Sequence, residues 1–342
     1  MYQNVYKYDE MKRRQQLSVR NTAGWHYFTH QLVEVYGPDA AAVLDRMYTA
    51  PISGMKNGKN KYCLMLNEQG RIIDDVIVIR QAEDRFWISN LNLFLLLKIL
   101  GAEAEGGARI QFSPITAQYD MYSVQGPASV ELVNAMVEKP IDSLRFFTME
   151  DNCIDELPVK INRAGFTGEK FGYEIYAAPA DAAVIAGKLR SVGPLFQAEE
   201  VTDLQLFCWS IPTEKGLLLM RDMLDLTPMD VGLERYVDWG KDFVGKEALL
   251  PMKDREPEWE LLGFTLDQDD AFIPSGHYGG PGCRVCLDGE KIGRVSKFVY
   301  SFTLEKNIGY VLVEKGRVEK GCHVSLCHNE NYDAVITDRI FF

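Results

Sequence analysis

A chain of 342 residues exceeds the usual size of a single hydrophobic core, so two or more domains are expected. Apolar residues make up 46% of the chain and charged residues 25%, which is typical of a folded globular protein and argues against long disordered segments. The net charge of -12 argues against a nucleic-acid partner, because affinity for phosphates depends on clustered lysines and arginines.

The amino-terminal sequence MYQNVYKYDEMKRRQQ is polar and lacks the apolar core of a signal peptide. We therefore expect a cytoplasmic protein with no membrane partner. The most apolar run, residues 93–100, contains Lys98 and is far shorter than a membrane-spanning segment, so it predicts a buried helix. The basic triplet Lys12-Arg13-Arg14 is interpreted as part of a solvated surface rather than as a binding patch.

The first elements in chain order repeat one pattern. A strand predicted at 31–36 is followed by the corner Gly37-Pro38 and by the helical sequence AAAVLDRM, whose apolar residues share one face. The same order returns as a strand at 119–124, the corner Gly126-Pro127 and the helical sequence ASVELVNAM. Proline just inside a helix start is favourable. The repetition predicts two related α+β halves.

The sequence GRIIDDVIVI, residues 70–79, places two adjacent carboxylates against a run of β-branched residues. Such a run predicts a strand buried on both faces, where an unpaired charge is costly. Because side chains alternate across a strand, Asp74 and Asp75 are expected to point to opposite sides. One can lie in solvent while the other enters the space beneath the sheet. The inward carboxylate is either a structural turn residue or a functional one.

The remaining elements of the first 250 residues follow from shorter patterns. A helix is predicted at 181–192 with Asp181 as its N-cap. Further strands are predicted at 85–89, 109–113, 158–163 and 172–178.

Helical periodicity fades from about residue 258 onward, and short strands follow. Their sequences are LLGFTL, CRVCL, KIGRVSKF, IGYVLV, HVSLC and DAVITDRIFF. Regular turn signals between them predict a small separate β-barrel or sandwich. The predicted domains are therefore 1–250 and 258–342, joined by a linker near Pro251 to Pro257.

Seven cysteines, an odd number in a chain with no export signal, indicate reduced thiols. Cys283 and Cys286 have zinc-knuckle spacing, and Cys322-His323 with Cys327-His328 could supply further ligands. However, CRVCLDGEKIGRV predicts a hairpin that turns at Asp288-Gly289. Residues three apart on a strand face opposite ways, as do Cys322 and Cys327 in CHVSLCH. We therefore predict no metal site.

Four stretches occur in this order: GRIIDD before an apolar strand, RAGFTGE (163–169) with GYEI (172–175), VGL (231–233) and KDFVGKEAL (241–249). Together they resemble the glycine-cleavage T-protein family, the folate-dependent aminomethyltransferases. SVRNTAG, VYGPDA and VQGP also resemble family landmarks, so the resemblance covers roughly residues 18–340. It implies folate-binding α+β subdomains closed by the C-terminal barrel around a central channel for tetrahydrofolate.

The resemblance also implies roles for individual residues. In the family the second aspartate of the pair lies beside the reacting nitrogen of folate, which makes Asp75 the predicted catalytic residue. Tyr62, Asn90 and Glu174 match folate-contacting residues, and Phe166 replaces a tyrosine of the family's folate-pocket loop, keeping the ring and losing the hydroxyl. The alternatives are structural: a strand start at Asp75, a strand aromatic at Tyr62, a turn residue at Asn90 and a solvated Glu174.

The chain also departs from the family pattern. Thr202 stands where the family has an arginine, which removes a cation from the expected pocket. The family's D-V-S-H segment reads Tyr27-Phe-Thr-His30 here, and only about 17 residues precede SVRN. These departures weaken the expectation of a lipoyl-carrier partner more than they weaken the expected fold.

The function implied is a tetrahydrofolate-dependent one-carbon transferase, and we expect a monomer. In the aminomethyl version, a lipoyl-bound aminomethyl group passes to folate with loss of ammonia, giving methylene-tetrahydrofolate. In a demethylase version, a methyl group leaves an oxygen, nitrogen or sulfur atom of a small molecule. A third alternative is a non-enzymatic folate-binding regulator or assembly protein, whose signature cysteine is absent from KDFVGKE (241–247). A nicotinamide or flavin oxidoreductase is excluded by the lack of GxGxxG.

Overall fold

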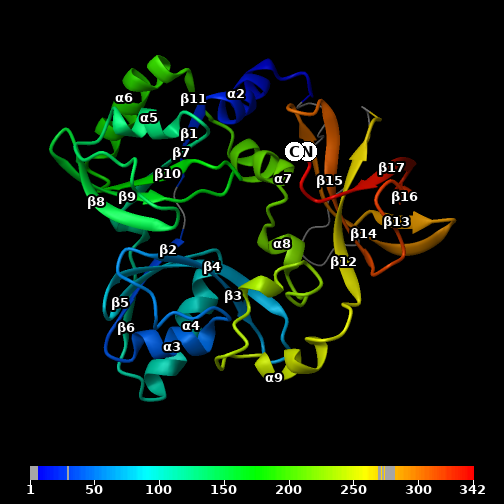
Figure 1. Ribbon diagram of the computed structural model, residues 1–342, viewed down its shortest axis with the longest axis horizontal. Coiled ribbons are helices and arrows are strands. Elements are labelled where there is room, and N and C mark those ends of the chain that lie inside the picture. The colour runs from blue at the N-terminus through cyan, green and yellow to red at the C-terminus, as the bar shows by residue number, and fades with distance from the viewer. Residues whose placement is uncertain (1–6, 29–30, 269–270, 272, 274–281) are drawn as a thin grey trace.

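The computed structural model describes residues 7–28, 31–268, 271, 273 and 282–342. It contains two sheets, each with helices on one face, and a closed barrel beside them (Figure 1). The predicted α+β class with a C-terminal β-barrel is therefore confirmed. Among the described residues, no helix combines the length and the apolar character needed to cross a lipid bilayer.

The first half is an antiparallel five-stranded sheet in the order β3-β4-β5-β2-β6. Helices α3 (Ala40–Met47) and α4 (Leu93–Glu105) cover one face, and their apolar stripes pack on the sheet to form one core. The strands are β2 (Gln31–Tyr36), β3 (Asn60–Leu66), β4 (Ile72–Ala82), β5 (Arg85–Asn90) and β6 (Gln111–Pro114).

The second half is a six-stranded sheet in the order β11-β1-β7-β10-β9-β8. Only the pair β1 and β11 is parallel. Helices α5 (Ser129–Asn134) and α6 (Ala182–Val192) cover one face and share a core with it. The strands are β1 (Ala23–Tyr27), β7 (Asp120–Gln125), β8 (Thr148–Ile154), β9 (Leu157–Arg163), β10 (Gly172–Ala177) and β11 (Ala198–Glu200).

A Gly-Pro corner joins strand to helix in both halves, as the repeated pattern predicts. Gly37 has φ +129° and Gly126 has φ +122°, a region in which glycine is favoured. A Cβ atom would lie 2.4 Å from the Arg109 carbonyl oxygen at Gly37, and 2.5 Å from the Val19 carbonyl oxygen at Gly126. Each corner therefore requires glycine for both its backbone conformation and its close packing.

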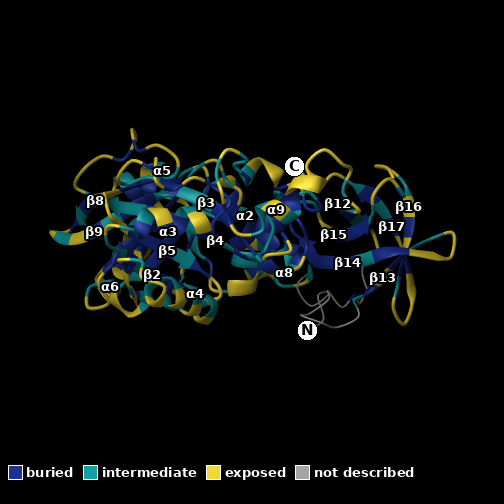
Figure 2. Ribbon diagram, turned by 90° about the horizontal axis from the view of Figure 1, so that it is seen from below, coloured by how far each residue is buried: buried dark blue, intermediate teal, exposed yellow. Residues whose placement is uncertain are grey.

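The two sheets meet through the faces that their helices leave uncovered. Leu32, Ile79, Met121 and Tyr176 are buried at this contact, which we call the inter-sheet cluster. The resulting order of layers is helix, sheet, sheet, helix (Figure 1). Figure 2 shows that buried residues concentrate in the strands, whereas exposed residues lie on the loops and outer helix faces.

Short helical segments lie between the two halves and the barrel (Figure 1). They are the π-helix η3 (Leu206–Ser210), α7 (Ile211–Glu214), α8 (Met220–Met223), η4 (Glu234–Tyr236) and α9 (Lys246–Leu249). Helix α2 (Glu10–Asn21) precedes β1 and contacts both β11 and η3. These elements bring side chains from distant parts of the sequence next to the sheet face that carries Asp75.

The barrel closes in the order β12-β15-β14-β13-β16-β17 and all its pairs are antiparallel. The predicted turn at Asp288-Gly289 has φ +50° and +84°, as a tight hairpin turn between right-twisted strands requires. The strands are β12 (Trp259–Leu266), β13 (Arg284–Leu287), β14 (Glu290–Ser301), β15 (Lys306–Glu314), β16 (His323–Cys327) and β17 (Asn331–Thr337).

Two local predictions are wrong, and a third is confirmed without the hydrogen bond it implied. The apolar run 93–100 does form a helix, but only Leu96 and Leu100 are buried, because a single stripe faces the sheet, and Phe94 is 84% exposed. Asp181 is the N-cap of α6, as predicted, although its side chain forms no capping hydrogen bond. The last strand ends at Thr337, and the chain then turns toward α7, where the Phe341 N–H donates to the Glu214 carbonyl oxygen.

Candidate functional site

The pairing of β3 with β4 places Tyr62 and Asp75 on one sheet face. Tyr62 is opposite Ile77, and Leu64 is opposite Asp75. Because side chains alternate, Asp75 and Ile77 point toward the other sheet, whereas Asp74 and its neighbour Val76 point toward the covering helices. The predicted opposite orientation is confirmed. The expectation that one carboxylate lies in solvent is wrong, since Asp74 is 1% exposed and Asp75 is half-buried.

Asp74 has a structural role at the start of α4. Its Oδ2 accepts from the Asn92 N–H at 3.4 Å, and its Oδ1 accepts from the Asp75 N–H at 3.0 Å. Asn92 is itself the N-cap of α4. Burial raises the pKa of Asp74 to about 6, against the opposing effect of these two N–H donors. Of the two adjacent carboxylates, Asp74 is therefore the one that fixes the local backbone, at β4 and at the start of α4.

Asp75 has the properties expected of an acid–base group. Burial raises its pKa to about 7, and the nearby charge of Asp74 contributes to the rise. A hydrogen-bonding interaction with the Tyr62 hydroxyl opposes the rise, and the more weakly coupled Asp222 adds to it. Near neutral pH the carboxyl of Asp75 is therefore divided between its protonated and ionised forms, the condition under which a proton donor or acceptor is most effective.

Tyr62 forms a wall beside Asp75. Its ring packs edge-on against Tyr236, with 4.7 Å between ring centroids and 68° between planes. Its hydroxyl lies 4.0 Å from the Met223 sulfur of α8. Burial, followed by the charge of Asp75, raises the pKa of the Tyr62 hydroxyl well above its ordinary value, so this group stays protonated. It can donate a hydrogen bond but cannot act as a base.

Glu174 points into the inter-sheet region from the middle of β10 and is 7% exposed. Its Oε2 accepts from Asn162 Nδ2 at 2.8 Å and from the Tyr176 hydroxyl at 3.0 Å. Asn162 in turn accepts from Asn60 of β3, so the polar chain crosses from one sheet to the other. Burial raises the pKa of Glu174, and both donors oppose this. The alternative of a solvated Glu174 is excluded.

The second carboxylate oxygen of Glu174 remains available. Among the described residues Oε1 has no hydrogen-bond partner, and it is not sealed away from the surface. A buried carboxylate with half of its accepting capacity unused is expected where a ligand supplies the missing donor. This geometry favours a binding role for Glu174, although one oxygen is already taken up by the protein.

Asn90 is 2% exposed and closes β5. Neither its amide nitrogen nor its amide oxygen has a partner among the described residues. A buried amide without hydrogen bonds is costly. The side chain of Asn90 therefore either destabilises the folded protein or forms hydrogen bonds with a bound ligand. Ile88 faces the covering helices, and alternation places Asn90 on that same side, away from Asp75. The structure therefore does not bring Asn90 together with Asp75 on one face.

Phe166 belongs to an aromatic group that borders the inter-sheet region. Its ring lies 5.2 Å from Phe28 and 5.6 Å from Phe207, which it meets at 89°. Phe28 contacts the inter-sheet cluster directly. The loop that carries Phe166 thus reaches the edge of the region that Glu174 enters, and the lost hydroxyl leaves an apolar surface there.

A buried ion pair joins strand β14 to helix α8, and the sequence analysis did not predict it. Lys297 Nζ of β14 lies 2.6 Å from Asp222 Oδ2 of α8, and both side chains are fully buried. Ser296 Oγ donates to Asp222 Oδ1 at 2.7 Å, so both carboxylate oxygens are satisfied. The sequence did contain a sign of this pair, because Lys297 lies inside the largely apolar sequence VSKFVY, where a buried lysine requires a partner. The pair fixes the barrel to α8, the helix whose Met223 contacts Tyr62.

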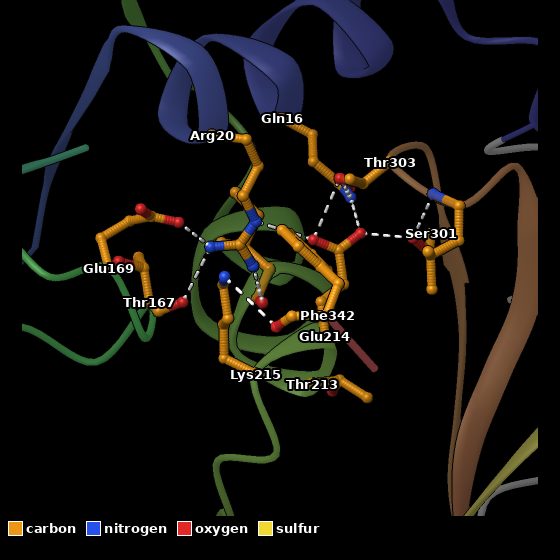
Figure 3. Close-up of polar contacts among 12 residues, drawn as sticks. Gln16, Arg20, Thr167, Glu169, Thr213, Glu214, Lys215, Ser301, Thr303 and Phe342 are labelled. Atoms are coloured by element: carbon orange, nitrogen blue, oxygen red, sulfur yellow. Dashed lines mark hydrogen bonds and ion pairs between the residues drawn. The ribbon is translucent and has the colours of Figure 1, made fainter. Parts of the chain in front are cut away.

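A second buried polar network joins four distant segments (Figure 3). Glu214 of α7 is fully buried and accepts from Gln16, Arg20, Ser301 and Thr303. The guanidinium of Arg20 also pairs with Glu169 and donates to the backbone oxygens of Thr167 and Ile211. The network therefore holds helix α2, the loop after Phe166, helix α7 and strand β14 in one arrangement. No local pattern in the sequence indicated it.

The remaining sequence predictions concern residues away from Asp75. Thr202 is exposed and exchanges hydrogen bonds with Gln15 of α2. His30 lies outside the described residues. Cys283 is buried inside the barrel whereas Cys286 is half-buried on the outer side, so the two thiols diverge as the strand alternation predicts. Within the described part of the chain, no group of His, Cys, Asp and Glu has a geometry suited to a metal ion.

Comparison with known proteins identifies the family. The model of the GCVT N-terminal domain matches residues 2–241, and that of the glycine cleavage T-protein C-terminal barrel domain matches residues 260–342. The chain belongs to the glycine-cleavage T-protein family. The resemblance inferred from the motifs is confirmed, and the chain is a divergent member of an enzyme family of aminomethyltransferases, which use tetrahydrofolate.

Individual relatives support the same assignment. An aminomethyltransferase of Clostridium botulinum is 30% identical over 340 residues, which span 95% of this chain and 87% of the relative. One from Bacillus mycoides is 29% identical, with 95% and 88% covered. Among solved structures, the glycine cleavage system aminomethyltransferase T of Bartonella henselae has a TM-score of 0.84 at 23% identity, covering 97% of this chain and 89% of that one. This last likeness concerns the fold alone.

The residues present fit a reduced folate. The free Glu174 Oε1 can accept from the N–H groups at the edge of a pterin ring. The apolar group around Phe166 and the ring of Tyr62 offer surfaces to the planar parts of such a ligand. When bound, tetrahydrofolate supplies the nitrogen atoms that accept a one-carbon unit. Asn90 adds an unpaired buried amide, but on the other side of β5.

Proposed function

We propose that this protein transfers a one-carbon unit to tetrahydrofolate, with Asp75 as the proton-transferring residue and Glu174 as the anchor for the ligand. The observation that carries the proposal is the Asp75 carboxyl, whose pKa is raised by burial to about 7 beside the protonated Tyr62 hydroxyl. A carboxyl balanced in this way can take a proton at Oδ when ionised and return one when protonated.

The surrounding residues hold Asp75 in one position. Asp74 is bonded to the Asp75 N–H at 3.0 Å, which orients the backbone of the pair. Tyr62 and α8 close the space on one side, and the ion pair of Lys297 with Asp222 anchors α8 to the barrel. Fixed positioning of this kind lowers the entropic part of a reaction barrier.

We infer that the donor is an aminomethyl group carried on a lipoyl arm, because the curated relatives are named aminomethyltransferases. A small methylated molecule is the alternative donor, which the same placement of Asp75 would serve. The departures around Thr202 affect donor recognition rather than proton transfer, since Thr202 contacts Gln15 of α2 and not Asp75.

Binding and chemistry can be tested separately. Calorimetric titration with a reduced folate should show binding to the wild type, weakened by about 10-fold to 100-fold in Glu174→Gln, as for loss of a hydrogen bond to a charged group. Glu150→Gln, an exposed glutamate on β8 of the same sheet, is the matched control and should bind normally. Equal affinity in Glu174→Gln and wild type would show that Glu174 is not the anchor.

Single-turnover assays then test the chemistry. With an aminomethyl-lipoyl carrier as donor, Asp75→Asn should lower the rate by about 10²-fold to 10⁴-fold while leaving folate affinity nearly unchanged. The exposed Asp254→Asn is the control. Turnover with methylated amines, ethers or sulfonium compounds but not with the carrier would replace the aminomethyl donor by the demethylase alternative. Absence of folate binding in the wild type would refute one-carbon transfer altogether.

A further inference from the structure

A cavity lies at the junction between the first domain and the barrel. Its volume is about 390 Å³, within the range of pockets that hold small organic ligands. One side is the segment after α8, residues 224–226, and the other side is the outer surface of β12, β14 and β15. Neither Asp75 nor Glu174 lines it, so this cavity is distinct from the candidate folate site.

Arg294 of β14 is the unusual residue of this cavity. It is half-buried, yet no described residue forms a hydrogen bond, an ion pair or a ring contact with its guanidinium. Arg20, which is also buried, donates hydrogen bonds to four residues. Burial lowers the pKa of Arg294, and the charge of Asp222 opposes this. A cation that is partly removed from water without a hydrogen-bonding partner is costly. A ligand anion would remove that cost.

Two further charges stand at the rim. Lys291, three residues before Arg294, is exposed and likewise has no ion-pair partner among the described residues. Asp225 is exposed on the opposite wall, and no described residue bonds to its carboxylate. Its backbone is nonetheless fixed: the Asp225 N–H donates to the Ile72 carbonyl oxygen at 3.0 Å, and Arg71 donates to the Asp225 carbonyl oxygen at 3.2 Å.

The backbone conformation of Asp225 indicates that this residue is held in a fixed position at the cavity. Its φ is +63°, in the left-handed region that few non-glycine residues adopt and that aspartate tolerates better than most. Between the charges, the cavity wall is apolar and aromatic: Leu312 is buried, and the indole of Trp259 is half-buried. The cavity therefore presents two cations, the unpaired carboxylate of Asp225, the carboxylate of Glu314, which is paired with Arg317, and an aromatic surface.

We propose that this cavity binds a small zwitterion of the amino-acid type, with its carboxylate on Arg294 and Lys291 and its ammonium group toward Asp225. The planar fork of Arg294 suits a carboxylate. The indole of Trp259 offers its face to the ligand's ammonium group or apolar side chain. A multiply charged phosphate fits less well, because Asp225 and Glu314 also line the cavity. Binding of such a ligand here would be a function separate from one-carbon transfer.

The location predicts what the ligand would do to the protein. Asp225 and Arg294 belong to the first domain and the barrel, respectively, so a bound zwitterion would connect the two parts. Because a ligand stabilises the state that binds it, thermal unfolding should shift upward with ligand concentration.

The test is a titration of the full-length protein with alanine, leucine and phenylalanine, followed by calorimetry and by tryptophan fluorescence. Propionate, propylamine and inorganic phosphate serve as carboxylate-only, ammonium-only and phosphate probes. At least one amino acid should bind, and Trp259→Phe should remove the fluorescence change. Arg294→Gln should weaken binding by about 10-fold to 100-fold, whereas Arg284→Gln, an exposed arginine on the adjacent strand β13, should not.

Asp225→Asn separates a zwitterion site from a simple anion site. It should weaken amino-acid binding and leave propionate binding unchanged. Two outcomes overturn the proposal: no amino acid binds at millimolar concentration, or propionate or phosphate binds the wild type as tightly as every amino acid does. Because Asp225 and Lys291 are exposed, their variants should fold even if Arg294→Gln does not. Folate binding, measured in the same samples, reports separately on the proposed one-carbon function.

Discussion

Replacement of Asp75 by asparagine should make the protein more stable while it removes activity. Burial and the neighbouring Asp74 raise the pKa of Asp75 from its ordinary 3.8 to about 7. A rise of that size corresponds to a cost of about 4 kcal/mol in the folded state above pH 7. Because the side chain keeps part of its surface in water and is coupled to Asp74, we expect about half of this, or about 2 kcal/mol.

The sign follows from proton binding. Between about pH 4 and about pH 7 the folded protein holds a proton on Asp75 that the unfolded chain has released, so stability falls as pH rises through this window. Asp75→Asn lacks this loss. Urea unfolding should therefore show a gain of about 2 kcal/mol at pH 8 and about half of it at pH 5.5.

Asp254→Asn, which removes an exposed charge, should change the free energy of unfolding by less than about 0.5 kcal/mol at either pH. If Asp75→Asn were no more stable than wild type at pH 8, or if its effect were the same at both pH values, Asp75 would not be a desolvated carboxylate. The assignment of Asp75 as a proton-transferring group near neutral pH would then lose its physical basis.

Three further substitutions test the buried polar groups, each by urea unfolding at neutral pH. Asn90→Leu should raise the free energy of unfolding by about 1–3 kcal/mol, because it removes an amide with no partner; a loss of stability would mean that the amide is satisfied. Lys297→Met should lower it by about 3–5 kcal/mol by leaving Asp222 buried and unpaired, and adding Asp222→Asn should restore most of the loss. Arg20→Met should lower it by a similar amount, and an effect below about 1 kcal/mol would show that the network of Figure 3 is not a closed unit.

The buried network of Arg20 and Glu214 also explains how the parts of the molecule keep one arrangement. Arg20 and Glu214 are 194 positions apart, and Ser301 lies a further 87 positions along the chain. Breaking one member leaves charges in a dry environment, so the parts cannot separate without a large cost. This network fixes the loop after Phe166 relative to helices α2 and α7 and strand β14.

Local periodicity in the sequence determined the elements and much of the architecture. The alternation in GRIIDDVIVI placed Asp74 and Asp75 on opposite faces, the repeated Gly-Pro corners indicated two halves, and the turn signals after residue 258 indicated the barrel. These features depend on neighbours within a few residues, which is why a single sequence reveals them. The order of the motifs supplied the family.

The tertiary structure alone decided which side chains meet. Asp75 was expected from the family resemblance, but its pKa is raised by burial and by the charge of Asp74, against the opposing hydrogen bond of Tyr62. The half-occupied carboxylate of Glu174 and the unpartnered guanidinium of Arg294 likewise have no local signature. Burial, charge pairing and cavity shape arise from segments that are distant in sequence, and only the folded chain brings them within a few ångströms of one another.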